Sequence, residues 1–323
     1  MLVKMILAFG IGLGLALLLY PLAIPYLHKI KFGQSIRQEG PKSHLIKAGT
    51  PTMGGVVFII TSIATALIVI PKAFSDKTFL LVLFAFIAYG IIGFVDDFLI
   101  VVKKNNDGLK AKYKFLMQSV LAVVFYILYR SLTNSLIIIP FTSIQIDLGW
   151  FYMILVFFMF TGTSNAVNLA DGLDGLCAGL SIFAFIPYIF FCYRSGLINI
   201  AIFLCGLIGS LLGYLKYNFH PAKIFMGDAG SLALGGLLAA VAMVTKEEIA
   251  LVLIGGVFVI EVLSDIIQIG SFKLTGKRVF KMAPIHHHFE LSGWKETKVV
   301  LVFWLCGLVL SLIGLLIGVL SYG

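Results

Sequence analysis

Ten long apolar stretches restrict what this chain can fold into. The stretch that begins at Thr78 has no charged residue before Asp96, and as a helix it would extend roughly 27 Å, most of the hydrocarbon thickness of a bilayer. The 323 residues are 60% hydrophobic and 12% charged, with a mean hydropathy of +1.06, which is far from the composition of soluble domains. We therefore predict an all-α polytopic membrane protein with one domain over residues 1–323. The ten predicted transmembrane helices cover residues 3–27, 52–70, 78–100, 115–130, 150–168, 174–193, 197–216, 230–245, 249–270 and 299–320.

Basic residues are concentrated on alternate connections between these stretches. Of the 24 Lys and Arg residues, 18 lie in or at the edge of residues 28–51, 101–114, 217–229 and 271–298. Because cytoplasmic connections are enriched in Lys and Arg, this distribution predicts that these four connections are cytoplasmic and that both termini lie outside. Membrane topology thus accounts for the net charge of +9, and we expect no nucleic-acid partner.

Two further patterns predict local structure. Residues 135–148 hold two short β-prone runs, which are typical of a small external β-hairpin. Gly10 and Gly14, like Gly314 and Gly318, have the four-residue spacing at which membrane helices pack closely, either within one chain or between subunits.

Unusual polar clusters all fall on the predicted cytoplasmic side. The first is Lys47 with the following Thr-Pro-Thr-Met-Gly-Gly, which leads into the second apolar stretch. Either Thr50 or Thr52 fits a helix cap. The start of a helix also has exposed N–H groups, so with Lys47 beside it this segment equally fits an anion site.

Two adjacent carboxylates, Asp96 and Asp97, end the third apolar stretch. Ionised carboxylates at that depth are costly unless they are paired, hydrated or bound to a cation. Neighbouring residues on a helix point roughly 100° apart, so one carboxylate can meet a cation while the other faces a substrate. Lys112 and Lys114 in the next connection are either partners of this pair or ordinary interface anchors.

Two more acidic clusters flank the sixth and eighth predicted helices. Asn168, Asp171 and Asp174 are spaced i, i+3 and i+6, so on a helix they would share one face. Before the eighth helix, Gly227 lets a phosphate approach the backbone and Asp228 can hold a hard cation on it. The alternative for the first cluster is a polar turn between the fifth and sixth predicted helices with the aspartates as helix caps, and the alternative for Asp228 is a helix N-cap.

A polar stripe follows one face of the ninth predicted helix. It consists of Glu261, Ser264, Asp265 and Gln268. A glutamate inside a membrane span indicates a functional site. We expect the stripe to line a hydrated cleft.

Three consecutive histidines, His286, His287 and His288, follow this helix. On a helix they cannot all face one metal, so the triplet alone does not indicate a zinc site. They suit phosphate contacts, proton transfer or the shaping of a loop.

The clusters together indicate a class of chemistry. Oxygen ligands without cysteine favour Mg²⁺ or Mn²⁺ over zinc. A metal with Lys and His groups is suited to phosphoryl transfer, and a site at a membrane surface can join a water-soluble phosphate donor to a lipid acceptor. The residue types do not identify the donor.

The motifs TPTMGG, GFVDDF, NLADGLDGL, FMGDAGS and MAPIHHHFE occur in this order along the chain. In this combination the sequence resembles, over essentially its whole length, the phospho-N-acetylmuramoyl-pentapeptide transferase family, a branch of the polyprenyl-phosphate N-acetylhexosamine-1-phosphate transferases. The resemblance implies a homodimeric, Mg²⁺-dependent enzyme of the bacterial cytoplasmic membrane with ten spans. Its cytoplasmic site would transfer phospho-N-acetylmuramoyl-pentapeptide from the UDP-linked donor to undecaprenyl phosphate, giving lipid I and UMP for peptidoglycan synthesis.

The resemblance also implies residue roles. Asp228 would be the main Mg²⁺ ligand, and Asp96 or Asp97 would act on the lipid phosphate as a base or a positioning group. The residues expected to take part in catalysis are Asp96, Asp97, Asp228, Lys112, Lys114, His286, His287 and His288. The residues expected to contact the nucleotide-sugar are Lys47, Asn168, Asp171, Asp174, Asn218, Phe225 and Gln268. The patterns described above add Thr52, Gly227 and Glu261 to the substrate site.

Two alternative functions share many of these features. UDP-N-acetylglucosamine could be the donor in place of the muramoyl-pentapeptide nucleotide. A cation-coupled transporter should place acidic residues near mid-span and have internal repeats. Here the acidic residues cluster at one face and no repeat is detectable, although Glu261 fits a transporter as well.

Overall fold

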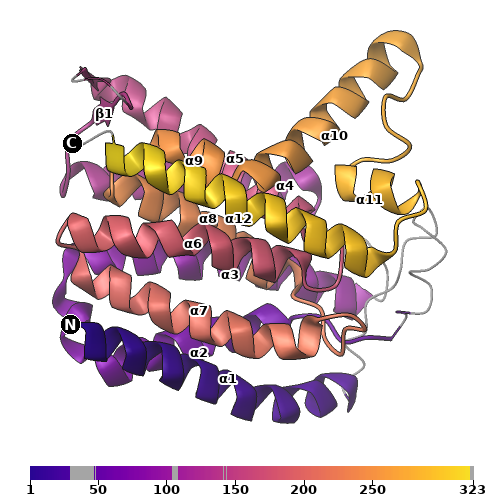
Figure 1. Cartoon of the computed structure of the whole chain (residues 1–323), viewed down its shortest axis with the longest axis horizontal. Coiled ribbons are helices and arrows are strands. Elements are labelled where there is room, and N and C mark those ends of the chain that lie inside the picture. The colour runs from indigo at the N-terminus through magenta and orange to yellow at the C-terminus, as the bar shows by residue number, and fades with distance from the viewer. Residues whose placement is uncertain (30–46, 48, 104–107, 141, 143, 321–323) are drawn as a thin grey trace.

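A computed structural model describes residues 1–29, 47, 49–103, 108–140, 142 and 144–320. These residues form a bundle of long helices with a small sheet at one end, and the first residue of α1 and the last residue of α12 lie at that same end (Figure 1). The helices are α1 (Leu2–Lys29), α2 (Gly54–Val69), α3 (Lys77–Lys103), α4 (Ala111–Arg130), α5 (Tyr152–Leu169), α6 (Leu176–Arg194), α7 (Ile198–Asn218), α8 (Gly227–Val244), α9 (Glu248–Ile254), α10 (Gly256–Thr275), α11 (Ile285–Glu290) and α12 (Glu296–Leu320). The 3-10 turns are η2 (Pro71–Ser75) and η3 (Gly149–Phe151), and the strands are β1 (Leu136–Ile138) and β2 (Gln145–Asp147).

The prediction of a multi-pass helical membrane protein is confirmed. Within the described residues, eight helices are long and apolar enough to cross a bilayer, and the bent pair α9 and α10 adds a ninth if it is one span. The second predicted span corresponds to α2, which has only 16 residues. The count of ten therefore stays a prediction that depends on α2.

Helix α8 is the centre of the bundle, with buried residues along its length from Ala229 to Met243. Glycines on α2 and α3 let the backbones of these two helices approach the first turn of α8. A β-carbon added at Gly93 of α3 would lie 2.0 Å from the carbonyl oxygen of Asp228, and one at Gly55 of α2 would lie 2.3 Å from the Cα of Gly230. Close backbone contact of this kind drives helix association in membranes, where lipid is as apolar as the side chains. The polar motifs of α2 and α3 consequently meet at the start of α8.

The predicted hairpin is present, but the ninth predicted span is not continuous. Strands β1 and β2 pair in antiparallel register, with Ile137 opposite Ile146. In the segment predicted as one helix over 249–270, α9 and α10 are bent by 79°. The break falls at Gly255, next to a second glycine, and paired small residues are a common cause of sharp kinks. Helix α10 therefore projects away from the bundle (Figure 1).

Replacement of Gly93 by alanine should destabilise this fold. The added β-carbon would overlap the Asp228 carbonyl, and neither backbone can yield without separating α3 from α8. Overpacking of this kind costs about 1–3 kcal/mol, so the midpoint of thermal unfolding in detergent should fall. Gly162→Ala on α5 is the matched control, because no described atom lies within 4 Å of its added β-carbon. Equal midpoints for the two variants would contradict the close contact.

Candidate active site

The carboxylate of Asp97 caps α8 from a different helix. Asp97 lies near the end of α3 and is 4% exposed. Its Oδ1 accepts the N–H of Asp228 at 3.1 Å, and its Oδ2 accepts the N–H of Ala229 at 3.0 Å. The first N–H groups of a helix have no partner within it, and the helix dipole favours a negative charge at this position. Asp97 therefore fixes the first turn of α8 against α3.

Gly227 is required for this arrangement. It has a φ of +75°, and a β-carbon at this position would lie 2.5 Å from Oδ2 of Asp97 and 2.8 Å from Oγ1 of Thr52. Only glycine combines this backbone conformation with that lack of space. Thr52 is accordingly buried beside the turn that precedes Asp228.

The prediction that Thr50 or Thr52 caps α2 is wrong. The residue before α2 is Met53, in the left-handed conformation, and it makes no side-chain cap. The first two N–H groups of α2, from Gly54 and Gly55, instead donate to backbone carbonyls of the segment before α8, the first of them to Phe225 at 2.8 Å. Because these donors are occupied, the start of α2 does not offer the anion site that the sequence suggested.

Lys114, in the first turn of α4, lies between two carboxylates. Its Nζ forms a close ion pair with Asp228 and lies 3.7 Å from Oδ2 of Asp96. Oδ1 of Asp96 accepts the N–H of Leu109 at 2.6 Å. Asn168, at the end of α5, donates to Oδ1 of Asp228 at 2.8 Å. Three aspartates and one ammonium thus meet at the start of α8. Oxygen atoms converge here on a cation, so the donor set fits Mg²⁺.

The expectation that Asn168, Asp171 and Asp174 share a helical face is wrong. Helix α5 ends at Leu169, so both aspartates lie in a turn before α6. The turn ends at Gly175, which has a φ of +81° and so interrupts the helix. The two aspartates therefore point to different clusters.

Asp171 faces the aspartates at the start of α8. Burial, and next the negative charges of Asp228 and Asp97, raises the pKa of Asp171 well above its usual range, although the N–H of Gly227 donates to this carboxyl. A cation in this cluster would favour the ionised form of the group.

Asp174 belongs to a second cluster, formed by four segments distant in sequence. Nζ of Lys47 lies 2.7 Å from Oδ1 of Asp174 and 2.6 Å from Oε1 of Glu296, and that Oε1 also accepts the N–H of Asp174 at 2.8 Å. Nδ1 of His220 lies 3.0 Å from Oδ2 of Asp174 and 3.5 Å from Oε2 of Glu296. Sequence reasoning missed Glu296, because it begins α12 without any motif around it. His220 was visible inside a polar motif, but nothing in the sequence indicated its partners.

Glu261 and His286 form a pair with no exposed surface. Nδ1 of His286 lies 3.1 Å from Oε2 of Glu261. A β-carbon added at Gly172 would lie 2.3 Å from Nε2 of His286, so α11 abuts the turn that holds Asp171. Of the stripe that we expected to line a hydrated cleft, Glu261 and Ser264 are buried and do not line one, whereas Asp265 and Gln268 are partly exposed. Glu261 is instead placed to hold the imidazole of His286 in position.

The other two histidines and Gln268 shape the loop between α10 and α12. The Gln268 side chain accepts the N–H of Phe280 at 2.9 Å and donates to the carbonyl of the same residue at 2.9 Å. Nδ1 of His287 lies 2.7 Å from Glu290, and Nδ1 of His288 accepts a backbone N–H at 3.1 Å. The three histidines have three different partners, as expected for residues that cannot share one metal.

The remaining predicted residues differ in how close they lie to these clusters. Asn218 is buried and joins two loops, accepting the N–H of Gly175 at 2.9 Å and donating to the carbonyl of Ile224 at 2.9 Å. Lys112 is exposed, and among the described residues its interaction is with the ring of Tyr113. The structure thus brings Lys114, but not Lys112, to the aspartates.

Comparisons with known proteins agree with the motifs. A family model described as Glycosyl transferase family 4 matches residues 79–246, and the model of the phospho-N-acetylmuramoyl-pentapeptide-transferase signature 1 matches residues 47–59. A phospho-N-acetylmuramoyl-pentapeptide-transferase from Geobacillus thermodenitrificans is 51% identical over 317 residues, which cover 97% of this chain and 98% of the relative. This chain belongs to the phospho-N-acetylmuramoyl-pentapeptide-transferase family.

Two staphylococcal relatives with the same name support the assignment. The one from Staphylococcus carnosus is 53% identical over 310 residues, or 94% of this chain and 96% of the relative. The one from Staphylococcus aureus is 52% identical over 313 residues, or 96% and 98%. The first family model includes the whole cluster at the start of α8, and the signature begins at Lys47. The transferase family inferred from the motifs is thereby confirmed.

Asp97→Asn should destabilise the transferase more than Asp96→Asn. An asparagine amide has one oxygen, so one of the two N–H groups at the start of α8 would lose its acceptor and face another donor. A buried group left unsatisfied costs about 1–3 kcal/mol. Asp96→Asn keeps an oxygen for Leu109 and removes one of several like charges. Thermal unfolding in detergent compares the variants, and a midpoint for Asp97→Asn equal to or above that of Asp96→Asn would contradict the capping role.

Proposed function

We propose that this chain transfers phospho-N-acetylmuramoyl-pentapeptide from its UDP-linked donor to undecaprenyl phosphate, giving lipid I and UMP in peptidoglycan synthesis. The observation that carries the proposal is the meeting of Asp96, Asp97 and Asp228 with Lys114 at the first turn of α8. Carboxylates for a metal beside a fixed ammonium are the groups that phosphoryl transfer uses to position and neutralise phosphates. The names of the full-length relatives supply the transferred group.

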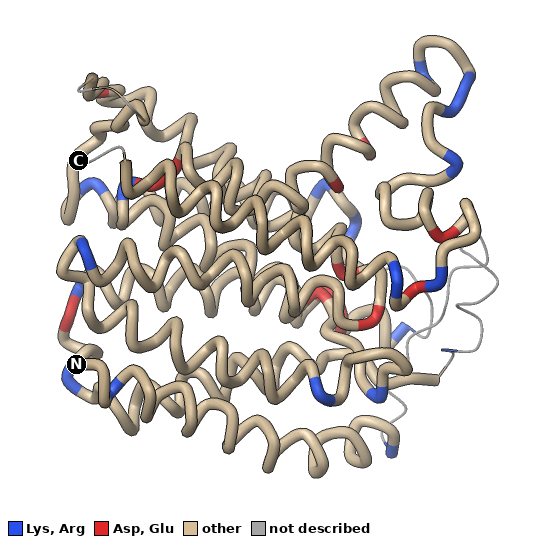
Figure 2. Tube along the Cα trace, in the orientation of Figure 1, with Lys and Arg blue, Asp and Glu red and all other residues tan. Residues whose placement is uncertain are grey.

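In this proposal the acidic cluster faces the cytoplasm of a bacterium. The enzyme would be a single transferase domain that crosses the cytoplasmic membrane ten times, with both termini outside, and would act as a homodimer in the bilayer. The alternation of Lys and Arg between connections supports this orientation. The start of α1 and the end of α12 lie at one end of the bundle, as an even number of crossings requires (Figure 1). In Figure 2 most acidic residues gather at the other end.

Mg²⁺ would be held chiefly by Asp228, with Asp96 as a neighbouring carboxylate. The support is that oxygens of both residues already lie around a cation, the ammonium of Lys114. When bound, the metal would neutralise charge on the diphosphate and on the leaving nucleotide. Lys114 would then be able to contact a phosphate oxygen, and Asn168 would hold the Asp228 carboxylate in place.

Asp96 is the better candidate to act on the lipid phosphate. Both oxygens of Asp97 accept backbone N–H groups, whereas Oδ2 of Asp96 points toward Lys114. A lipid phosphate oxygen would attack the β-phosphorus of the donor in one in-line step, with release of UMP. The rival is a two-step route in which an aspartate attacks first.

The donor would extend from the α8 cluster toward the second cluster. Lys47 and Asp174 would meet the nucleotide-sugar, with Glu296 holding both in position. The histidines of α11 would lie near the sugar or the diphosphate. The other residues proposed to contact the donor are Thr52, Asn168, Asp171, Asn218, Phe225, Gly227 and Gln268, with Glu261 supporting His286.

Product analysis tests the reaction itself. Purified protein is incubated with undecaprenyl phosphate and Mg²⁺, and with either the UDP-linked muramoyl-pentapeptide or UDP-N-acetylglucosamine. The lipid products are then separated. Lipid I and UMP should form from the first donor only. Lipid-linked N-acetylglucosamine from the second donor would refute the proposed specificity.

Asp228→Asn should lower turnover by about 100-fold or more while the fold survives, because a neutral amide is a poor Mg²⁺ ligand. Turnover is measured against Mg²⁺ concentration, and thermal unfolding reports on the fold. Asp147→Asn on the hairpin is the matched control and should keep wild-type turnover, since Asp147 lies on the hairpin and has no contact with the α8 cluster among the described residues. Near-normal turnover of Asp228→Asn at limiting Mg²⁺ would refute the assignment of the ligand.

A further inference from the structure

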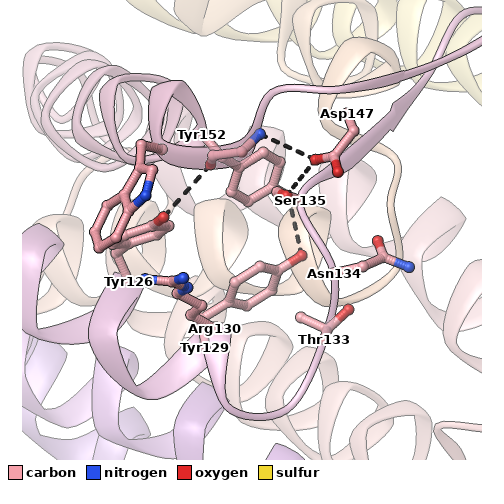
Figure 3. Close-up of a pocket in the computed structure, with 10 residues that line it drawn as sticks. Tyr126, Tyr129, Arg130, Thr133, Asn134, Ser135, Asp147 and Tyr152 are labelled. Carbon is pink, nitrogen blue, oxygen red and sulfur yellow. Dashed lines mark hydrogen bonds between the residues drawn. The ribbon is translucent and has the colours of Figure 1, made fainter.

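A pocket lies at the end of the bundle opposite the acidic cluster. It has a volume of about 360 Å³ and is formed by the last turn of α4, the hairpin and the start of α5 (Figure 3). Helix α4 carries Lys114 in its first turn and Arg130 at its end, roughly 24 Å apart at helical rise. The pocket is therefore separate from the proposed reaction site, and in the orientation proposed above it lies on the external side of the membrane.

Arg130 places a positive charge in the lining of the pocket. Its guanidinium lies 4.1 Å from the ring centre of Trp150, and it makes no hydrogen bond or ion pair with any residue that the structure describes. A guanidinium stacked on an indole keeps its N–H donors free, and its fork geometry suits a phosphate. Trp150 and Phe151 are 69% and 71% exposed. Exposed aromatic residues of this kind are typical of the membrane–water interface.

Asp147 supplies a charge of the opposite sign. The hydroxyl of Ser135 and the N–H of Gly149 donate to its Oδ1 and lower the pKa of Asp147 below its usual value, so the group is a carboxylate at neutral pH. Figure 3 shows Asp147 and Arg130 on opposite sides of Tyr129 and Tyr152. Among the residues that line the pocket, Asp147 is the anion and Arg130 the cation. The ammonium of Lys246 lies against the rings of Tyr129 and Tyr152, with the Glu248 carboxyl as a charged neighbour.

The tyrosines at the base of the pocket are held in place by hydrogen bonds to each other and to neighbouring side chains. The hydroxyls of Tyr129 and Tyr152 lie 2.9 Å apart, and Lys246 donates to both. Tyr152 also bonds to the buried carboxyl of Glu248. A site that is rigid before binding loses less conformational entropy when a ligand enters.

The surface beside the pocket is apolar. Ile127 and Leu128 on α4 are 63% and 45% exposed, and Ile154 and Phe158 on α5 are 48% and 64% exposed. In a membrane protein these side chains face acyl chains. A molecule with its polar group in the pocket would therefore have an apolar surface for its tails directly beside it.

We propose that this pocket binds the headgroup of an amine-bearing phospholipid. The phosphodiester would accept hydrogen bonds from Arg130, and the ammonium would lie toward Asp147. Charge complementarity favours this zwitterion over a lipid with a phosphate alone, because only the amine-bearing headgroup adds a positive charge that can face the Asp147 carboxylate. This inference concerns the face opposite the proposed reaction site and does not depend on that reaction.

Native mass spectrometry of the detergent-purified protein tests the proposal. Phosphatidylethanolamine, phosphatidylglycerol and soluble glycerophosphoethanolamine are titrated separately. The wild type should retain phosphatidylethanolamine best and the soluble headgroup least. Arg130→Ala should weaken phosphatidylethanolamine binding by at least about tenfold. Lys72→Ala, which removes an exposed cation of η2 at the same end of the bundle, is the matched control and should change nothing.

Asp147→Asn tests the contact with the lipid ammonium separately from the contact with the lipid phosphate. It should lower binding of phosphatidylethanolamine to the level of phosphatidylglycerol and leave phosphatidylglycerol binding unchanged. Retention of phosphatidylethanolamine by Arg130→Ala at the wild-type level would overturn the site, and equal binding of the soluble headgroup would overturn a lipid as its occupant. Arg130→Ala should keep wild-type turnover in detergent, and this turnover shows that the variant protein folds. If it fails to fold, an Asp147→Asn protein that still prefers the amine lipid overturns the proposal.

Discussion

The bond between the Asp97 carboxylate and the first turn of α8 is the interaction on which the rest of the site depends. It forms because Gly93 and Gly227 leave no side chain between α3 and α8. Once Asp97 is fixed, Asp96 is directed about 100° away on the same helix, toward Lys114 and Asp228. The two adjacent aspartates therefore have different environments. One holds backbone N–H groups, and the other keeps an oxygen beside the cation.

Each of the two polar clusters is built around a lysine between two carboxylates. Lys114 lies between Asp96 and Asp228, and Lys47 lies between Asp174 and Glu296. Partly buried ion pairs gain little net stability, because desolvation offsets most of their attraction. Such an arrangement can therefore exchange partners with a metal or a charged substrate at small cost. Both lysines lie at the edge of the tightly packed core, whereas α8 lies at its centre.

The helices, the hairpin and the acidic motifs could be predicted because hydropathy and local spacing determine them. Contacts between distant segments could not. Glu296 has no sequence signal of its own, and its role depends on where α12 begins relative to Lys47. Thr52 looked like a helix cap, but the carbonyls before α8 satisfy the first N–H groups of α2. The break at Gly255 was hidden inside a continuous apolar stretch.

In the substrate-free protein the Lys114 ammonium occupies the cation position between Asp96 and Asp228. The most direct test is a titration of the substrate-free protein with Mn²⁺, followed by electron paramagnetic resonance. Lys114→Met should bind the metal about tenfold more tightly than the wild type, because the competing ammonium is gone and both carboxylates remain. Lys112→Met, which removes an exposed lysine of the same helix, should match the wild type. Unchanged or weaker binding in Lys114→Met would mean that the ammonium does not occupy the metal position.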